Sequence, residues 1–79
     1  MEKHSLNFED AHFVFESPTV TLEDDRYNYG EKRYITLGLL AQREILIVHT
    51  QRAEQTRIIS MRKANARERK IYKKRLETS

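Results

Sequence analysis

The stretch KRYITLGLLAQREILIVHT, residues 32–50, is rich in the β-branched and aromatic residues that favour strands. Two such runs, 32–40 and 44–50, are separated by the three residues AQR, and this spacing is typical of a β-hairpin. We therefore predict that the two runs pair as antiparallel strands.

Similar patterns extend the sheet on both sides of this hairpin. TRIISMR, residues 56–62, follows a polar loop at 51–55 and is predicted to be a third long strand. Residues 19–22 alternate threonine with apolar residues, which indicates a short strand, and an acidic loop is predicted over 23–30. The pattern predicts a meander of three to four antiparallel strands.

A helix is predicted at the amino-terminal end. Asn7 is a favourable cap, and apolar residues then recur at helical spacing at Phe8, Ala11 and Phe15. This helix is expected to end before Pro18, which disfavours helix in the residue that precedes it.

A second helix is predicted after the third long strand. Asn65 and Glu68 have the spacing of a capping box, and Glu68, Tyr72 and Leu76 then share one face. Because this apolar stripe is thin, the helix must dock on the sheet or on a partner to be stable. The predicted fold class is α+β, a small antiparallel sheet flanked by an N-terminal helix and a basic C-terminal helix, in one domain of 79 residues.

Composition excludes several classes of site. The chain has no cysteine, so it has neither a disulfide nor a thiolate metal site nor a cysteine nucleophile, and its three histidines lack metal-ligand spacing. We therefore expect no metal and no cofactor. Its longest apolar run is too short to cross a bilayer and its amino terminus lacks a signal pattern, so we expect a cytoplasmic protein without a membrane partner.

Charge is distributed unevenly along the chain. Residues 1–25 carry a net charge of −6, whereas residues 26–79 carry +9. Residues 57–75 alone contain nine Lys or Arg and a single acid. This asymmetry predicts an anionic partner, and the alternative is that the basic helix is simply a solvated face.

The strongest candidate site is the junction between the third long strand and the basic helix. Simple alternation divides 57–62 into two faces, with Ile58, Ser60 and Arg62 on one and Arg57, Ile59 and Met61 on the other. The strand delivers a hydroxyl and cations to the start of the helix, which is the chemistry of a phosphate site. His49, among apolar neighbours at a strand end, is predicted to be a half-buried packing residue rather than an acid or base.

Four segments in order resemble the BrnT family of type II toxin components. These are KHSLNFEDAHFVFESP, DRYNYGEKRYITLG, IVHTQR and RIISMRKANARERKIY, which together run from Lys3 to Tyr72. The resemblance implies a RelE-like fold, an enzyme that cleaves RNA as a metal-independent endoribonuclease and thereby inhibits translation, and a cognate BrnA-type antitoxin that contacts DNA and neutralises the toxin.

The charge pattern, the chemistry of RNA cleavage and the resemblance together give hypotheses for the roles of individual residues. The candidate catalytic residues are Arg33, Arg62, Lys3, His4 and Glu68. The candidate RNA-binding residues are Arg52, Arg57, Ser60, Lys63, Arg67, Arg69 and Lys70. On this hypothesis Arg62 and Arg33 hold the scissile phosphate, and Lys3, His4 or Glu68 transfers protons, although Glu68 in a capping box is also a structural residue.

The sequence departs from the family pattern in two ways. Family members usually begin with a further strand, so we expect a single domain over 1–79 that lacks this first strand. The second departure is His49, where an aromatic residue is common in the family. Two alternative functions therefore stay open, a non-catalytic basic module that binds RNA or protein and an inactive remnant that only binds antitoxin.

Overall fold

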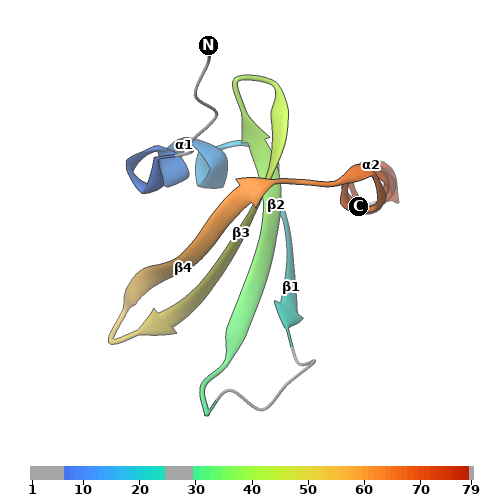
Figure 1. Cartoon of the computed structure of the whole chain (residues 1–79). Coiled ribbons are helices and arrows are strands. Elements are labelled where there is room, and N and C mark those ends of the chain that lie inside the picture. The colour runs from blue at the N-terminus through green and yellow to red at the C-terminus, as the bar shows by residue number, and fades with distance from the viewer. Residues whose placement is uncertain (1–6, 25–29, 79) are drawn as a thin grey trace.

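The fold, seen in a computed structural model that describes residues 7–24 and 30–78, is one antiparallel sheet between two helical elements (Figure 1). In chain order the elements are η1 (Phe8–Asp10), α1 (Ala11–Glu16), β1 (Val20–Asp24), β2 (Arg33–Leu40), β3 (Arg43–Arg52), β4 (Gln55–Lys63) and α2 (Ala66–Thr78). The four strands lie in the order β1-β2-β3-β4. The predicted α+β class is confirmed. Within the described residues no helix is long and apolar enough to cross a membrane.

Both long hairpins close through turns of two residues. Ala41 and Gln42 have φ values of 52° and 66°, and Ala53 and Glu54 have 47° and 68°. Two successive positive φ values define the turn whose twist matches that of the paired strands. The longer predicted connections, 41–43 and 51–55, were therefore wrong, and Arg43 is the first residue of β3.

β1 is also longer than predicted. Glu23 lies opposite Tyr34 and Asp24 lies opposite Arg33, because the register with β2 extends the strand through Asp24. The predicted acidic loop over 23–30 was therefore wrong at its start, and its residues 25–29 lie outside the described residues.

α1 covers one face of the sheet. Its buried residues Ala11 and Val14 pack against Ile45 and Ile47 of β3. The contact is close because a Cβ at Gly38 of β2 would lie 2.8 Å from Val14 Cγ1, so only glycine leaves room for the helix. The predicted cap is confirmed, since Asn7 Oδ1 accepts the Glu9 N–H at 3.3 Å.

α2 lies on the opposite face, where Tyr72 joins a cluster with Leu37 and Leu46 (Figure 1). Tyr72 is 3% exposed, whereas the neighbouring Ile71 is 37% exposed. The Tyr72 hydroxyl donates to the Pro18 carbonyl oxygen at 2.7 Å, and burial raises its pKa, so the hydroxyl stays protonated. A single buried aromatic thus docks a helix that has little other apolar surface, as the thin stripe predicted.

Candidate functional site

A β-bulge in β4 decides which of its side chains share a face. Val48 lies opposite Ser60, but the next residue, His49, lies opposite Ile58, so Ile59 is an extra residue in the strand. Bulges re-aim side chains and are frequent beside active sites. Ile58 consequently packs against the core under α1, and its predicted place on the face of Ser60 was wrong.

The same bulge brings two arginines to one face. Arg57 lies opposite Thr50, and Arg62 lies opposite Leu46. Directly paired residues share a face, and alternate residues of β3 return to the same face. Because Leu46 packs in the α2 cluster, both arginines belong to the α2 face. Their predicted separation to opposite faces was wrong because alternation cannot anticipate the bulge.

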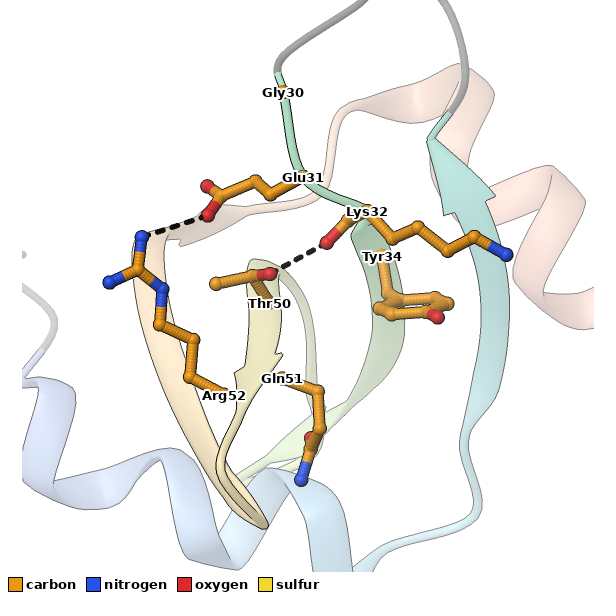
Figure 2. Close-up of a pocket in the computed structure, with 7 residues that line it drawn as sticks. All are labelled: Gly30, Glu31, Lys32, Tyr34, Thr50, Gln51 and Arg52. Carbon is orange, nitrogen blue, oxygen red and sulfur yellow. Dashed lines mark hydrogen bonds and ion pairs between the residues drawn. The ribbon is translucent and has the colours of Figure 1, made fainter.

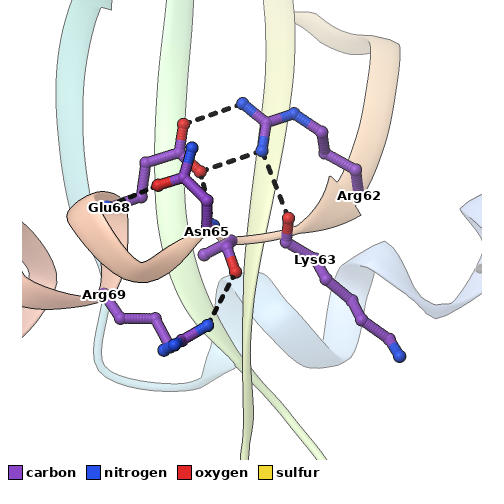
Figure 3. A network of polar contacts seen from close by, with 6 residues as sticks. Arg62, Lys63, Asn65, Glu68 and Arg69 are labelled. Atoms are coloured by element: carbon purple, nitrogen blue, oxygen red, sulfur yellow. Dashed lines mark hydrogen bonds and ion pairs between the residues drawn. The ribbon is translucent and has the colours of Figure 1, made fainter.

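Arg62 makes a bidentate ion pair with Glu68 at the start of α2 (Figure 3). Arg62 Nη1 lies 2.8 Å from Glu68 Oε1, and Nη2 lies 2.7 Å from Oε2. The Arg62 side chain is 52% exposed, so part of the guanidinium faces solvent. The Glu68 carboxylate therefore occupies the position on Arg62 at which a guanidinium binds two oxygens of a phosphate.

Glu68 is at the same time part of the predicted capping box. Its Oε1 accepts the Asn65 backbone N–H at 2.9 Å, and Asn65 Oδ1 accepts the Glu68 N–H at 2.8 Å. The capping box is confirmed. Glu68 thus links the first turn of α2 to β4 through one carboxylate.

A second ionic cluster lies where β2 begins (Figure 2). Arg52 Nη2 donates to Glu31 Oε1 at 3.1 Å, and Arg33 Nε lies 3.5 Å from Glu31 Oε2. The guanidinium groups of Arg52, which has the larger effect, and of Arg33 lower the pKa of Glu31, so the carboxylate stays ionised at neutral pH. Thr50, beside them, donates its hydroxyl to the Lys32 carbonyl oxygen at 2.6 Å.

The two ionic clusters lie apart on the sheet. Arg33 lies opposite Thr50 of β3, and Arg62 lies opposite Leu46 of the same strand. Thr50 and Leu46 are four residues apart along β3. At about 3.3 Å per residue this offset is about 13 Å along the strand. The hypothesis that Arg33 and Arg62 clamp one phosphate stays a prediction, and the geometry brings Arg62 together with Glu68 and Arg33 together with Glu31.

The other candidate residues are distributed around these two clusters. Ser60 is exposed opposite Val48, on the α2 face, and Arg67 and Lys70 are exposed on α2. Lys63 lies opposite Ile45, whose side chain belongs to the α1 core, so Lys63 is on the other face from Arg62. Lys3 and His4 lie outside the described residues.

Sequence reasoning missed one cation, Arg43. It lines a pocket together with Lys63 and with Arg69, whose guanidinium donates to the Ala64 carbonyl oxygen at 3.2 Å. Nothing local marks Arg43, because it comes near the start of α2 only through the register of β3 with β4.

One of three comparisons with known proteins identifies a family for this chain. The family described as the ribonuclease toxin BrnT of type II toxin-antitoxin systems matches residues 1–68. The chain belongs to the BrnT family. Comparisons with curated proteins and with solved structures return no match. A BrnT toxin acts on RNA and has a cognate antitoxin, so the cations of the α2 face belong to a protein with a polyanionic substrate.

His49 of this BrnT chain lies on the α1 face, away from the Arg62 cluster. It is 8% exposed, and its Nε2 lies 2.8 Å from the Thr36 hydroxyl, which in turn lies 2.8 Å from the Thr21 hydroxyl. The Phe15 ring meets the imidazole edge-on at a centroid distance of 5.2 Å. These contacts fit the predicted packing role.

Burial lowers the pKa of His49 below its usual range, and this predicts an acid-sensitive fold. Because the folded pKa lies below the unfolded value of about 6.5, stability is complete above that pH and is lost as the pH falls through the folded pKa. We expect the melting temperature to fall between pH 7.5 and pH 5. The decrease should shrink in His49→Gln and persist in His12→Gln, which changes an exposed histidine. An unchanged decrease in His49→Gln would assign the effect to other groups.

Proposed function

We propose that this BrnT family member is an endoribonuclease that cleaves RNA without a metal ion at the α2 face of its sheet, and that this cleavage inhibits translation. The supporting observation is the row formed by Arg57, Ser60 and Arg62, which the bulge in β4 brings to one face, with Arg62 paired to Glu68 at one end and Arg57 opposite Thr50 at the other. A row of cations along a strand follows a phosphate backbone, and a hydroxyl between them adds a hydrogen-bonding group.

The proposed reaction uses the RNA's own 2′-hydroxyl as the nucleophile. A base removes the hydroxyl proton, an O2′–P bond forms, and the P–O5′ bond breaks as an acid protonates the leaving oxygen. The products are a 2′,3′-cyclic phosphate and a 5′-hydroxyl. Negative charge develops on the phosphorus oxygens, and preorganised cations are the groups that stabilise it.

Arg62 is the cation we assign to this charge. Glu68 binds both terminal nitrogens of the Arg62 guanidinium, one to each carboxylate oxygen. The guanidinium is therefore already oriented to donate two parallel hydrogen bonds to a pair of oxygens. A scissile phosphate then competes with the Glu68 carboxylate for Arg62. A carboxylate released by that exchange lies next to the reacting group and is our candidate for proton transfer, with Lys3 and His4 as the other two.

The test is cleavage of single-stranded RNA by the purified chain in an excess of chelator. We expect fragments ending in a cyclic phosphate, and we expect no fragments when every 2′-hydroxyl carries a methyl group, because the nucleophile is blocked. Loss of cleavage in chelator that added magnesium restores would contradict metal independence. Binding without fragments from either RNA would instead support the alternative, a binding module.

The partner we propose is a BrnA-type antitoxin that covers the same cationic face. The exposed cations of α2 and β4 offer complementary charge to an acidic segment. Expression of the chain alone should arrest bacterial growth, and coexpression of the antitoxin should restore it. Normal growth with tight antitoxin binding would favour an inactive remnant.

A further inference from the structure

The pocket between the end of β4 and the start of α2 collects cations from three elements. Arg43 comes from β3, Lys63 from β4 and Arg69 from α2, and in the described lining Glu44 is the single acid. Like charges repel when they are brought together, so such a lining is stabilised by an anion. The pocket is therefore a candidate anion site.

The backbone around this pocket is held in place. The Ala64 N–H donates to the Glu44 carbonyl oxygen at 3.0 Å, and Arg69 Nη1 donates to the Ala64 carbonyl oxygen at 3.2 Å. Ala64 itself is buried. These bonds tie β3, the β4–α2 connection and the first turn of α2 together, so the backbone that carries the three cations is fixed and the Arg69 guanidinium is held against it.

Glu44 offsets only one of the three positive charges in the described lining. Its side chain is on the α2 face, because it precedes Ile45, whose side chain belongs to the α1 core. Its carboxylate also contributes, after the larger effect of burial, to the raised pKa of Tyr72. The pocket therefore keeps an excess of positive charge.

The pocket begins one residue from the proposed cleavage site. Arg62 Nη1 donates to the Lys63 carbonyl oxygen at 3.2 Å, and Glu68 precedes Arg69 in α2. Figure 3 shows Lys63 and Arg69 extending away from the Arg62–Glu68 pair, on the other side of the β4–α2 connection. A nucleic-acid strand that crosses this connection meets the two sites in succession.

We propose that the pocket of Arg43, Lys63 and Arg69 binds a backbone phosphate of the RNA, next to the phosphate at Arg62. This inference rests on the proposed function and adds a second phosphate site and a residue, Arg43, to it. The consequence is that the substrate is an extended single strand held at successive phosphates rather than a single dinucleotide.

The test measures binding of a short single-stranded RNA of mixed sequence, methylated at each 2′-hydroxyl so that it cannot be cleaved. The dissociation constant is measured over a salt series for the wild type, Arg43→Gln, Arg43→Lys and Lys73→Gln. Each lost phosphate contact lowers the slope of log affinity against log salt by about 0.7 for a single strand. Lys73 is exposed on α2 and does not line the pocket, so Lys73→Gln is the matched control for loss of one charge.

We expect Arg43→Gln to weaken binding several-fold at low salt and to lower the slope by about 0.7, with Arg43→Lys close to the wild type. Neutral methylphosphonates can replace the phosphates of the RNA one linkage at a time. For the wild-type protein, we expect this replacement to weaken binding at two adjacent linkages. One of these two effects should vanish in Arg43→Gln. Inorganic phosphate at the same ionic strength should not displace the RNA more than chloride does.

Two results would overturn the second site. One is a salt slope in Arg43→Gln that equals the slope in Lys73→Gln, and the other is sensitivity to a single linkage in wild-type protein. Displacement by inorganic phosphate would reassign the pocket to the free anion. Because this assay measures binding alone, its failure is distinct from failure of the proposed function, which is read as loss of cleavage.

Discussion

Arg62→Ala is expected to lower kcat/KM for RNA cleavage by at least about 100-fold, the loss usual for one preorganised donor to a developing oxyanion. Glu68 holds both terminal nitrogens of Arg62 in a bidentate pair, and Arg62 lies where β4 meets α2. Kinetics with purified variants and mapping of RNA 5′ ends in expressing cells measure the effect.

Of two companion variants, Lys73→Ala controls for the loss of a charge, and Glu68→Ala changes both the cap of α2 and the group that holds Arg62. Lys73→Ala removes an exposed charge elsewhere on α2 and should leave kcat/KM close to that of the wild type. Glu68→Ala removes the side-chain half of the capping box and should lower the free energy of unfolding by about 1 kcal/mol. Cleavage that persists unchanged in a folded Arg62→Ala protein would remove the central element of the mechanism.

Tyr72→Ala is expected to lower the free energy of unfolding by about 3–5 kcal/mol, the range for truncation of a large buried aromatic. Among the described side chains of α2, Tyr72 is the only one that is buried, and its hydroxyl bonds to Pro18 at 2.7 Å. A domain of this size has a total stability of about 5–15 kcal/mol, so the loss is a large share. Chemical denaturation measures it.

The consequence for function follows from what α2 carries. Undocking the helix moves Glu68 and Arg69 away from β4, so both proposed phosphate sites lose part of their geometry. Tyr72→Phe keeps the ring and should cost only about 1 kcal/mol for the lost hydrogen bond. Ile71→Ala is the matched control, since Ile71 is 37% exposed against 3% for Tyr72 and its truncation should cost clearly less. Equal losses in the Ile71 and Tyr72 variants would show that Tyr72 is not the main anchor.

Local chemistry explains which sequence predictions were correct. The capping box of Asn65 and Glu68 depends on groups three residues apart in the chain, so its spacing is visible without a fold. The two hairpins are visible for the same reason, as strand-forming runs separated by a few residues. The lengths of the two connecting turns were predicted wrongly, because the turn residues adopt left-handed conformations without being the glycine or asparagine that usually indicates them. These residues are Ala41, Gln42, Ala53 and Glu54.

The sequence by itself determined the antiparallel meander, the helix after it, the basic charge of that region and the resemblance to BrnT, because these depend on neighbours in the chain. Only the tertiary structure decided that Arg57 shares a face with Arg62, that Arg33 is paired with Glu31, and that Arg43 lines a pocket with Lys63 and Arg69. Strand register and one extra residue at Ile59 set those juxtapositions. Both arise from packing between distant segments, so no local pattern contains them.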